Sequence, residues 1–343
     1  MLYQNVYLQA FGYELPPRRV TSAELEERLD RIYQRLKLPK GRLEMMTGIR
    51  ERRLWTPGTR PSAAAALAGS KAMAASGVAA EDIDCLIFCS VSRDMMEPAT
   101  ASFVHNLLGL PERCLVFDLS NACLGFLNGM VMLANMIELG QIRTGLVVAG
   151  ETAENLLEST IIGLLADQKL TRKSFKPSFA SLTIGSAAVA LVMSSEGSGS
   201  SHRLVGGMPR ANTTHSNLCQ GGPQAGAGTL MATDSEELLQ RGVETASLAW
   251  RDFLVELDWQ SESIARFFCH QVGSAHSRLL FNTLGLDPEK NVETLAVLGN
   301  VGSVSAPITL AMGVEQQLLT AGDRAAVLGI GSGINCLMLG ILW

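Results

Sequence analysis

The chain has 343 residues, of which 47% are hydrophobic and 18% charged, and its formal net charge at pH 7 is −5. A chain this long and apolar can bury a large core, which excludes a disordered or low-complexity protein and fits two domains or one fused double domain. The sequence has no basic tail and no stripe of lysine and arginine, so we do not expect nucleic acid as a partner.

The cysteine pattern indicates a reducing compartment. Seven cysteines stand singly, without a Cys-x-x-Cys pair, in a chain too long to need disulfides, so we expect free thiols and a cytoplasmic protein. The first twenty residues lack the charged segment and apolar block of a signal peptide. The uncharged stretches 119–137 and 325–343 contain glycine, serine and asparagine, so we interpret them as a buried helix and a pair of buried strands, not as membrane spans.

Short apolar runs alternate with amphipathic stretches along the chain, which predicts an α/β fold with sheets covered on both faces. In chain order, the runs predict strands over 85–90, 114–118, 145–149, 187–193, 266–270, 293–297, 325–328 and 336–341. The amphipathic stretches predict helices over 62–76, 99–107, 234–257, 274–283 and 307–319.

A coarse internal repeat relates the two parts of the chain. Cys123 and Gly150 follow the strand 85–90 at spacings close to those at which Asn300 and Gly329 follow the strand ending at His270. Each part thus has the order strand, helix, strand, candidate site residue (Cys123 or Asn300), helix, strand, which indicates a duplicated α/β unit. We place the boundary in a Gly/Ser stretch, which gives a domain 1–197 with a candidate nucleophile and a domain 198–343 with the other candidate residues.

Three polar residues stand where strands give way to helices. Cys123 opens a helix whose N-terminus favours a thiolate and would lower the pKa of the thiol. His270 and Asn300 each follow a strand, where open α/β sheets place their sites. Each has a plainer interpretation, as a buried cysteine, a core histidine or a turn residue. Together they form a plausible nucleophile, acid/base and hydrogen-bond donor.

Seven segments resemble a known family over nearly the whole chain. They are GIRERRLW (48–55), SVSRDMMEPATAS (90–102), FDLSNACLGFLNGM (117–130), IGSAAVALVM (184–193), FCHQVGSAH (268–276), GNVGSVSAP (299–307) and GIGSGIN (329–335). The sequence is identified as a member of the thiolase superfamily of condensing enzymes, in the ketoacyl synthase III branch. The resemblance implies a homodimer and a five-layered αβαβα fold built from two duplicated halves.

Within this branch the sequence is most similar to the OleA-type acyl-CoA condensing enzymes of olefin biosynthesis. In that type a glutamate lies 26 residues before the nucleophilic cysteine, and Glu97 occupies this position. The segment ANTTHSNLCQGG (211–222) and both chain ends are also OleA-like. Gly125, the triplet 185–187 and the glycine-rich insertion 220–229 depart from the expected pattern, which leaves the preferred acyl chain length open.

The resemblance assigns roles to the residues that match. Cys123 attacks an acyl thioester and becomes acylated, while its own N–H and one N–H of a glycine-rich loop form the oxyanion hole. His270 and Asn300 hold the carbonyl of the second thioester. Glu97 removes an α-proton, from a loop that leaves the sheet at Glu97 itself and enters the neighbouring subunit's acyl channel. The glycine-rich loop is Gly331, Ser332 and Gly333.

The implied reaction is a non-decarboxylative, head-to-head Claisen condensation of two long-chain fatty acyl-CoA molecules to a 2-alkyl-3-oxo acid. The alternative is a decarboxylative condensation with a malonyl thioester, as in 3-oxoacyl-[acyl-carrier-protein] synthase III. A catalytically silent thiolase-fold subunit is a third interpretation, which the intact Cys, His and Asn disfavour. The resemblance implies acyl-CoA as substrate, no cofactor and no metal, and enzymes of an olefin pathway as partners.

Overall fold

The computed structural model describes residues 1–197, 202–224 and 228–343. Its main feature is a nine-stranded mixed sheet with the order β11-β12-β13-β8-β1-β7-β6-β4-β5. The strands of this sheet are β1 (Tyr7–Glu14), β4 (Cys85–Phe88), β5 (Leu115–Asp118), β6 (Thr144–Glu151), β7 (Ala187–Ser194), β8 (His202–Ala211), β11 (Ile264–Cys269), β12 (Arg324–Gly331) and β13 (Asn335–Leu342).

The sheet consists of two halves with the same strand order. The parallel pair β4–β6, continued by the antiparallel neighbours β7 and β1, matches the parallel pair β11–β12, continued by β13 and β8. The halves join where β1 meets β8, through the pairs Tyr7–Arg203 and Leu8–His202. The chain is therefore built from two duplicated α/β units, as the internal repeat predicts. The expected domain boundary falls at residues 197/198, next to 198–201, which lie outside the described residues; it stays a prediction.

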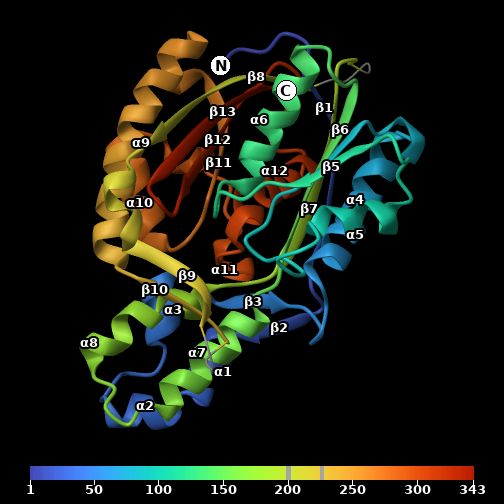
Figure 1. The fold of residues 1–343 in the computed structure, drawn as a ribbon. Helices are drawn as coiled ribbons and strands as arrows, with labels where there is room; N and C mark the ends of the chain where they lie inside the picture. Colours follow the sequence, from blue (N-terminus) through green and yellow to red (C-terminus); the bar gives the residue numbers. More distant parts are fainter. Residues whose placement is uncertain (198–201, 225–227) are drawn as a thin grey trace.

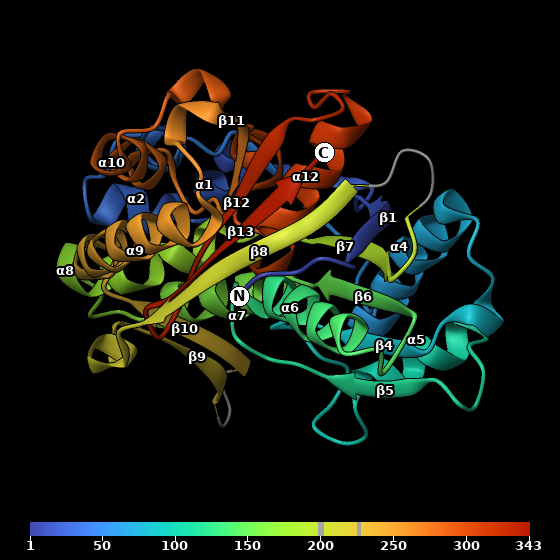
Figure 2. The ribbon, with the colours of Figure 1, turned by 90° about the horizontal axis from the view of Figure 1, so that it is seen from above.

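Helices form three layers around the two half-sheets (Figures 1 and 2). The helices α4 and α5 cover one outer face, α9 and α10 cover the other, and α6 and α12 lie between the two half-sheets. This is the five-layered αβαβα arrangement. The bounds of these helices are α4 (Pro61–Ser76), α5 (Thr100–Leu108), α6 (Gly125–Glu138), α9 (Ser235–Leu257), α10 (Ser274–Leu284) and α12 (Ser305–Glu315).

The middle layer forms the centre of the largest apolar cluster. The inner residues of α6 and α12 pack against both half-sheets, and side chains such as Phe126, Leu133 and Ile308 are almost fully excluded from water. This explains the uncharged stretch 119–137, because a helix between two sheets needs apolar residues all round. In the described part of the chain, none of the helices has the length and hydropathy needed to cross a membrane.

A smaller lobe projects from one end of the layers, at the bottom of Figure 1. None of the helices and strands predicted from the sequence lies in this lobe. Its core joins helices that are distant in sequence, with Leu25, Leu29 and Ile161 buried together. The lobe contains β2 (Arg18–Thr21), α1 (Ser22–Arg28), α2 (Asp30–Arg35), α3 (Arg42–Thr47), β3 (Glu51–Leu54), α7 (Glu154–Ala166), α8 (Arg172–Phe175), β9 (Cys219–Gln224) and β10 (Gly228–Thr233).

One predicted strand is wrong. The segment predicted as strand 293–297 contains instead the short helix α11 (Leu295–Leu298), and only an isolated bridge between Phe267 and Asn291 continues the sheet there. The physical reason is a side-chain cap, because the Gln271 Oε1 accepts hydrogen bonds from the backbone N–H groups of Thr294 and Leu295, at 2.9 and 2.8 Å. The capped N–H groups favour a helical turn over a strand.

Candidate active site

Cys123 stands in the tight turn between β5 and α6. The preceding residue, Ala122, has a φ of 45°, in the left-handed region that side chains rarely adopt. The turn leaves the Cys123 residue partly exposed, although protein atoms enclose its sulfur. The end of β12 packs against it, since a Cβ added to Gly331 would lie 3.7 Å from the Cys123 Cβ and 3.1 Å from the Leu124 Cγ. The glycine-rich loop that the sequence singled out therefore lies beside the candidate nucleophile.

The electrostatics of Cys123 differ from the prediction. Burial raises the pKa of the Cys123 thiol to about 12, and the neighbouring Cys219 and Glu151 side chains act in the same direction. Hydrogen bonds from the backbone N–H groups of Ser332 and of Cys123 itself lower the pKa, but by less. The predicted lowering at the helix N-terminus is thus wrong, because desolvation of the sulfur outweighs the favourable backbone dipoles. The two N–H groups are the ones that the sequence proposes for an oxyanion hole.

His270 follows the last residue of β11 and is buried. Its backbone N–H donates to the Leu328 carbonyl of β12 at 2.9 Å, three residues before Gly331. Burial lowers the pKa of His270 to about 3, with a further contribution from nearby His276, so its imidazole is neutral at physiological pH. Its Nδ1 is buried and has no hydrogen-bond partner among the described residues. A neutral, desolvated imidazole can donate one hydrogen bond to a carbonyl oxygen.

Asn300 is fixed by the backbone on both sides. Its N–H donates to Thr183 O at 3.0 Å, and its carbonyl accepts from the Gly185 N–H at 2.9 Å. The two segments approach so closely that a Cβ on Gly185 would lie 2.1 Å from the Leu298 carbonyl oxygen. The Asn300 Oδ1 accepts the Gly302 N–H at 3.1 Å, which orients the side-chain amide. Gly185, which departs from the family pattern, is therefore needed here for close approach.

A buried carboxylate, which no sequence pattern predicts as part of the site, lies beside the loop that follows Asn300. Glu151 ends β6, is 5% exposed, and accepts hydrogen bonds from the segment after β4 and from the loop after Asn300. Its charge also acts on Cys123. One signal could have identified it, since a lone acidic residue ends the otherwise apolar strand GLVVAGE. A charge at the end of a buried strand needs partners.

Glu97 lies in a long connection between β4 and α5. The strand ends at Phe88, so the chain leaves the sheet well before Glu97, and the prediction that it does so at Glu97 is wrong. The connection is fixed at both ends, where Asp94 accepts from Ser62 at 2.6 Å and the Asp118 carboxylate accepts from the Thr100 N–H at 2.8 Å. Glu97 itself is exposed in the single chain.

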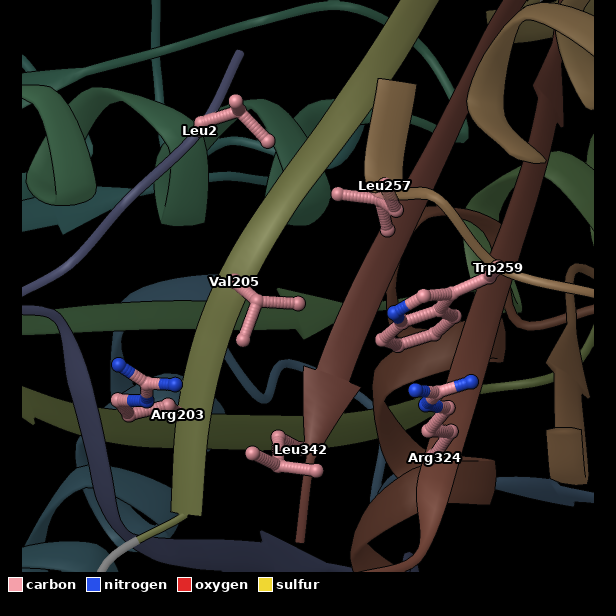
Figure 3. Close-up of a pocket in the computed structure, with 7 residues that line it drawn as sticks. All are labelled: Leu2, Arg203, Val205, Leu257, Trp259, Arg324 and Leu342. Carbon is pink, nitrogen blue, oxygen red and sulfur yellow. The ribbon is translucent and has the colours of Figure 1, made fainter. Parts of the chain in front are cut away.

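Two surface hollows outlined by described residues lie away from Cys123. Figure 3 shows one of about 220 Å³, in which the Arg324 guanidinium lies 5.4 Å from the centre of the Trp259 ring. The other, of about 320 Å³, adjoins the stacked rings of His202 and Trp343. Cys123 does not line either hollow. The hollow in Figure 3 is lined by Leu2, Arg203, Val205, Leu257, Trp259, Arg324 and Leu342.

Comparison with known proteins identifies the family. Residues 117–205 match the family 3-Oxoacyl-[acyl-carrier-protein (ACP)] synthase III, and residues 254–343 match its C-terminal part. The chain is 41% identical to an acyl-CoA:acyl-CoA alkyltransferase of Shewanella oneidensis and 38% identical to one of Xanthomonas campestris, each over 100% of both chains. The chain belongs to the acyl-CoA:acyl-CoA alkyltransferases of the OleA type.

Solved structures of the Xanthomonas campestris OleA share the fold. A Cys-to-Ala variant matches with a TM-score of 0.96 and 38% identity, covering 100% of this chain and 98% of that one. A Cys-to-Ser variant with bound lauric acid and lauroyl-CoA matches with a TM-score of 0.95, covering 100% of both chains. The OleA-type fold and membership are thus confirmed, and the roles of the individual site residues stay predictions.

Proposed function

We propose that this OleA-type acyltransferase condenses two long-chain fatty acyl-CoA molecules head to head to a 2-alkyl-3-oxo fatty acid. The observation that carries the proposal is the full-length match to two relatives named acyl-CoA:acyl-CoA alkyltransferase. A solved OleA structure with bound lauroyl-CoA supports a CoA thioester as the substrate. Two acyl-CoA molecules and one water give one 2-alkyl-3-oxo acid and two molecules of CoA, with no cofactor required.

The first half-reaction acylates Cys123. The thiol is protonated at neutral pH because burial raises its pKa, so its proton leaves as the sulfur attacks the thioester carbonyl and ends on the sulfur of the departing CoA. The N–H groups of Cys123 and Ser332, which hydrogen bond the sulfur, are suited to stabilise the oxyanion that forms next to it. The tetrahedral intermediate then expels CoA and leaves an acyl-cysteine.

The second half-reaction needs an enolate. His270, neutral at physiological pH, and Asn300, fixed by backbone hydrogen bonds, donate to the carbonyl oxygen of the second acyl-CoA. Glu97 removes the α-proton, and the resulting carbon nucleophile attacks the acyl-cysteine, which releases the Cys123 thiolate. Hydrolysis of the remaining thioester then releases the second CoA.

A homodimer would bring Glu97 to this site. The strand β5 forms one edge of the sheet, and its Leu115 is 50% exposed. The connection that carries Glu97 also exposes Val91, Met95 and Met96, the last at 87%. An unpaired sheet edge beside exposed apolar side chains favours pairing with a second copy. The seven free thiols suit a cytoplasmic location, and olefin-pathway enzymes stay predicted partners.

The second candidate is a decarboxylative condensation, which the match to the synthase III family favours. The two reactions differ in the source of the carbon nucleophile. We expect long-chain acyl-CoA alone to yield free CoA and a 2-alkyl-3-oxo acid, measured by thiol release and mass spectrometry. The matched control is Cys123→Ala, which should release no CoA. Turnover that strictly requires a malonyl thioester would replace the proposal with the synthase III reaction.

The roles of His270 and Asn300 have their own test. We expect His270→Ala and Asn300→Ala to become acylated at Cys123, yet to condense about 10²–10³-fold more slowly, the usual loss when one preorganised donor is removed. Intact-mass spectrometry measures the acyl adduct and product analysis measures condensation. Normal condensation in both variants would return these residues to structural roles.

A further inference from the structure

The Glu151 carboxylate joins two loops that the proposed mechanism uses separately. Its Oε1 accepts hydrogen bonds from the Val91 N–H at 2.9 Å, the Ser303 N–H at 3.3 Å and the Ser303 hydroxyl at 2.6 Å. Its Oε2 accepts the Ser92 N–H at 3.0 Å and the Ser92 hydroxyl at 2.8 Å. Five donors on one buried carboxylate satisfy both oxygens without a cationic partner among the described residues.

The loops are those of the proposed proton acceptor and of the carbonyl-binding amide. Val91 and Ser92 begin the connection in which Glu97 lies, and Ser303 follows Asn300 by three residues. The first loop comes from the N-terminal half of the fold and the second from the C-terminal half. Glu151 is therefore a point at which the two halves are bonded to each other within the candidate site.

The Glu151 side chain is closely packed against the loop that contains Gly302. Gly302 has a φ of 56°, and a Cβ there would lie 3.1 Å from the Glu151 Oε1. The Glu151 backbone is held as well, since its carbonyl accepts the Trp55 indole N–H at 3.0 Å. The carboxylate is thus fixed from the backbone outward, and it cannot shift without moving both loops.

We propose that Glu151 is a positioning residue that sets the proton-accepting loop and the carbonyl-binding loop relative to each other. It touches no reacting atom. This inference rests on the proposed condensation. Its charge has a separate consequence, because it adds to the burial that raises the pKa of the Cys123 thiol and so favours the uncharged acyl-cysteine over the free thiolate.

The test compares two variants that separate charge from reach. Glu151→Gln keeps the length and removes the charge, so the pH profile for alkylation of Cys123 by iodoacetamide should shift to lower pH, because one cause of the raised Cys123 pKa is removed. Glu151→Asp keeps the charge and shortens the reach, so the profile should stay in place. Both variants should still acylate Cys123 but condense at least about tenfold more slowly, a loss of about 1.4 kcal/mol or more.

The matched control is Glu154→Gln, a carboxylate three residues away that accepts a hydrogen bond from the Ser186 hydroxyl at 3.3 Å and is not among the groups that act on the pKa of Cys123. It should leave the profile and the ratio of condensation to acylation unchanged. Ser303→Ala removes a single donor on the Asn300 side and should slow condensation without moving the alkylation profile, which covers the case in which a Glu151 variant does not fold.

A ratio of condensation to acylation that stays at the wild-type value in the Glu151 and Ser303 variants would overturn the inference. An unshifted alkylation profile in Glu151→Gln would overturn the action of its charge on Cys123. The alkylation measurement does not use the condensation reaction. If wild-type protein failed to condense acyl-CoA, the proposed function would fail, while the action of Glu151 on Cys123 would still be decided by the profile.

Discussion

A buried thiol at the centre of the site is chemically unusual for a nucleophile. At Cys123, desolvation raises the pKa, whereas the backbone N–H groups of Cys123 and Ser332 lower it by less. The same N–H groups suit the oxyanion of an acyl intermediate. The site therefore favours the acylated, uncharged sulfur and a charged carbonyl oxygen over a free thiolate, which matches a residue that must store an acyl group until a second substrate arrives.

The raised pKa predicts a steep pH dependence for Cys123. Because the thiol titrates near pH 12, the thiolate fraction should grow about tenfold per pH unit from pH 7 to pH 10 without levelling off. The measurement is the rate of iodoacetamide modification of the Cys123 peptide, followed by mass spectrometry. Glutathione is the reference, since the rate for an unburied thiol levels off above about pH 9. A plateau for Cys123 below pH 8 would contradict the prediction.

The candidate residues could be found from sequence, but their electrostatics could not. Cys123 and His270 each follow a strand and precede a helix, whereas Asn300 follows the short helix α11 and not the predicted strand, so for Asn300 the family resemblance is the better guide. The direction of the Cys123 pKa was predicted wrongly, because the helix N-terminus is visible in the sequence while the burial of the sulfur is a tertiary property. Glu151 was missed because its five donors come from segments about 60 and 150 residues away.

At the scale of elements, apolar runs locate strands well where the strand is buried on both faces. The pairs β6–β7 and β12–β13 follow the predicted runs with ends extended by a few residues. The runs miss β1 and β8, in which polar residues and glycines interrupt the apolar sequence. They also assign α11 to a strand, since its Gln271 cap lies outside the segment. An apolar run in the sequence therefore indicates a buried segment, whereas a capping side chain that is distant in sequence can decide whether that segment forms a strand or a helix.

Helix α4 packs on the sheet through glycine. A Cβ on Gly12 in β1 would lie 2.3 Å from both the Ala68 carbonyl oxygen and the Ala72 nitrogen, which are backbone atoms of α4. We expect Gly12→Ala to lower the free energy of unfolding by about 2–3 kcal/mol, since the helix must move away from the sheet. Urea unfolding measures the change.

The control for this contact is Gly163→Ala in α7. Gly163 lies in an exposed stretch of the helix, and an added Cβ there meets no atom within 4 Å. Alanine should therefore stabilise the protein by up to about 1 kcal/mol through helix propensity. Equal effects of the two substitutions would show that the close approach of α4 to β1 does not limit stability.

At the scale of the whole molecule, the two duplicated halves each contribute residues to the candidate site. Cys123 follows a strand of the first half, while His270 and Asn300 follow elements of the second, and Glu151 bonds the two. Glu97 is the exception, because it is exposed in the single chain beside apolar side chains and a free sheet edge. A symmetric dimer that pairs this edge would complete two sites at once.

This arrangement predicts complementation between two inactive variants. Glu97→Ala should acylate Cys123 but not condense, and Cys123→Ala should do neither. If Glu97 serves the partner's Cys123, a mixed dimer has one complete site. Co-expression of the two variants with different affinity tags should then give about a quarter of wild-type condensation, since half of the dimers are mixed and each has one working site of two.

The matched control pairs Glu97→Ala with the double variant Cys123→Ala/Glu97→Ala, which keeps one nucleophile, supplies no Glu97 and should stay inactive. Mixed dimers of Glu97→Ala and Cys123→Ala that are purified through both tags should show about half of the wild-type rate, because one site in each dimer is complete. Product analysis by mass spectrometry measures the rate, and acyl adducts should appear only on the Glu97→Ala subunit. If the doubly tagged dimers are as inactive as their parents, Glu97 acts within its own subunit, and the exposed loop must then fold back over the Cys123 of the same chain.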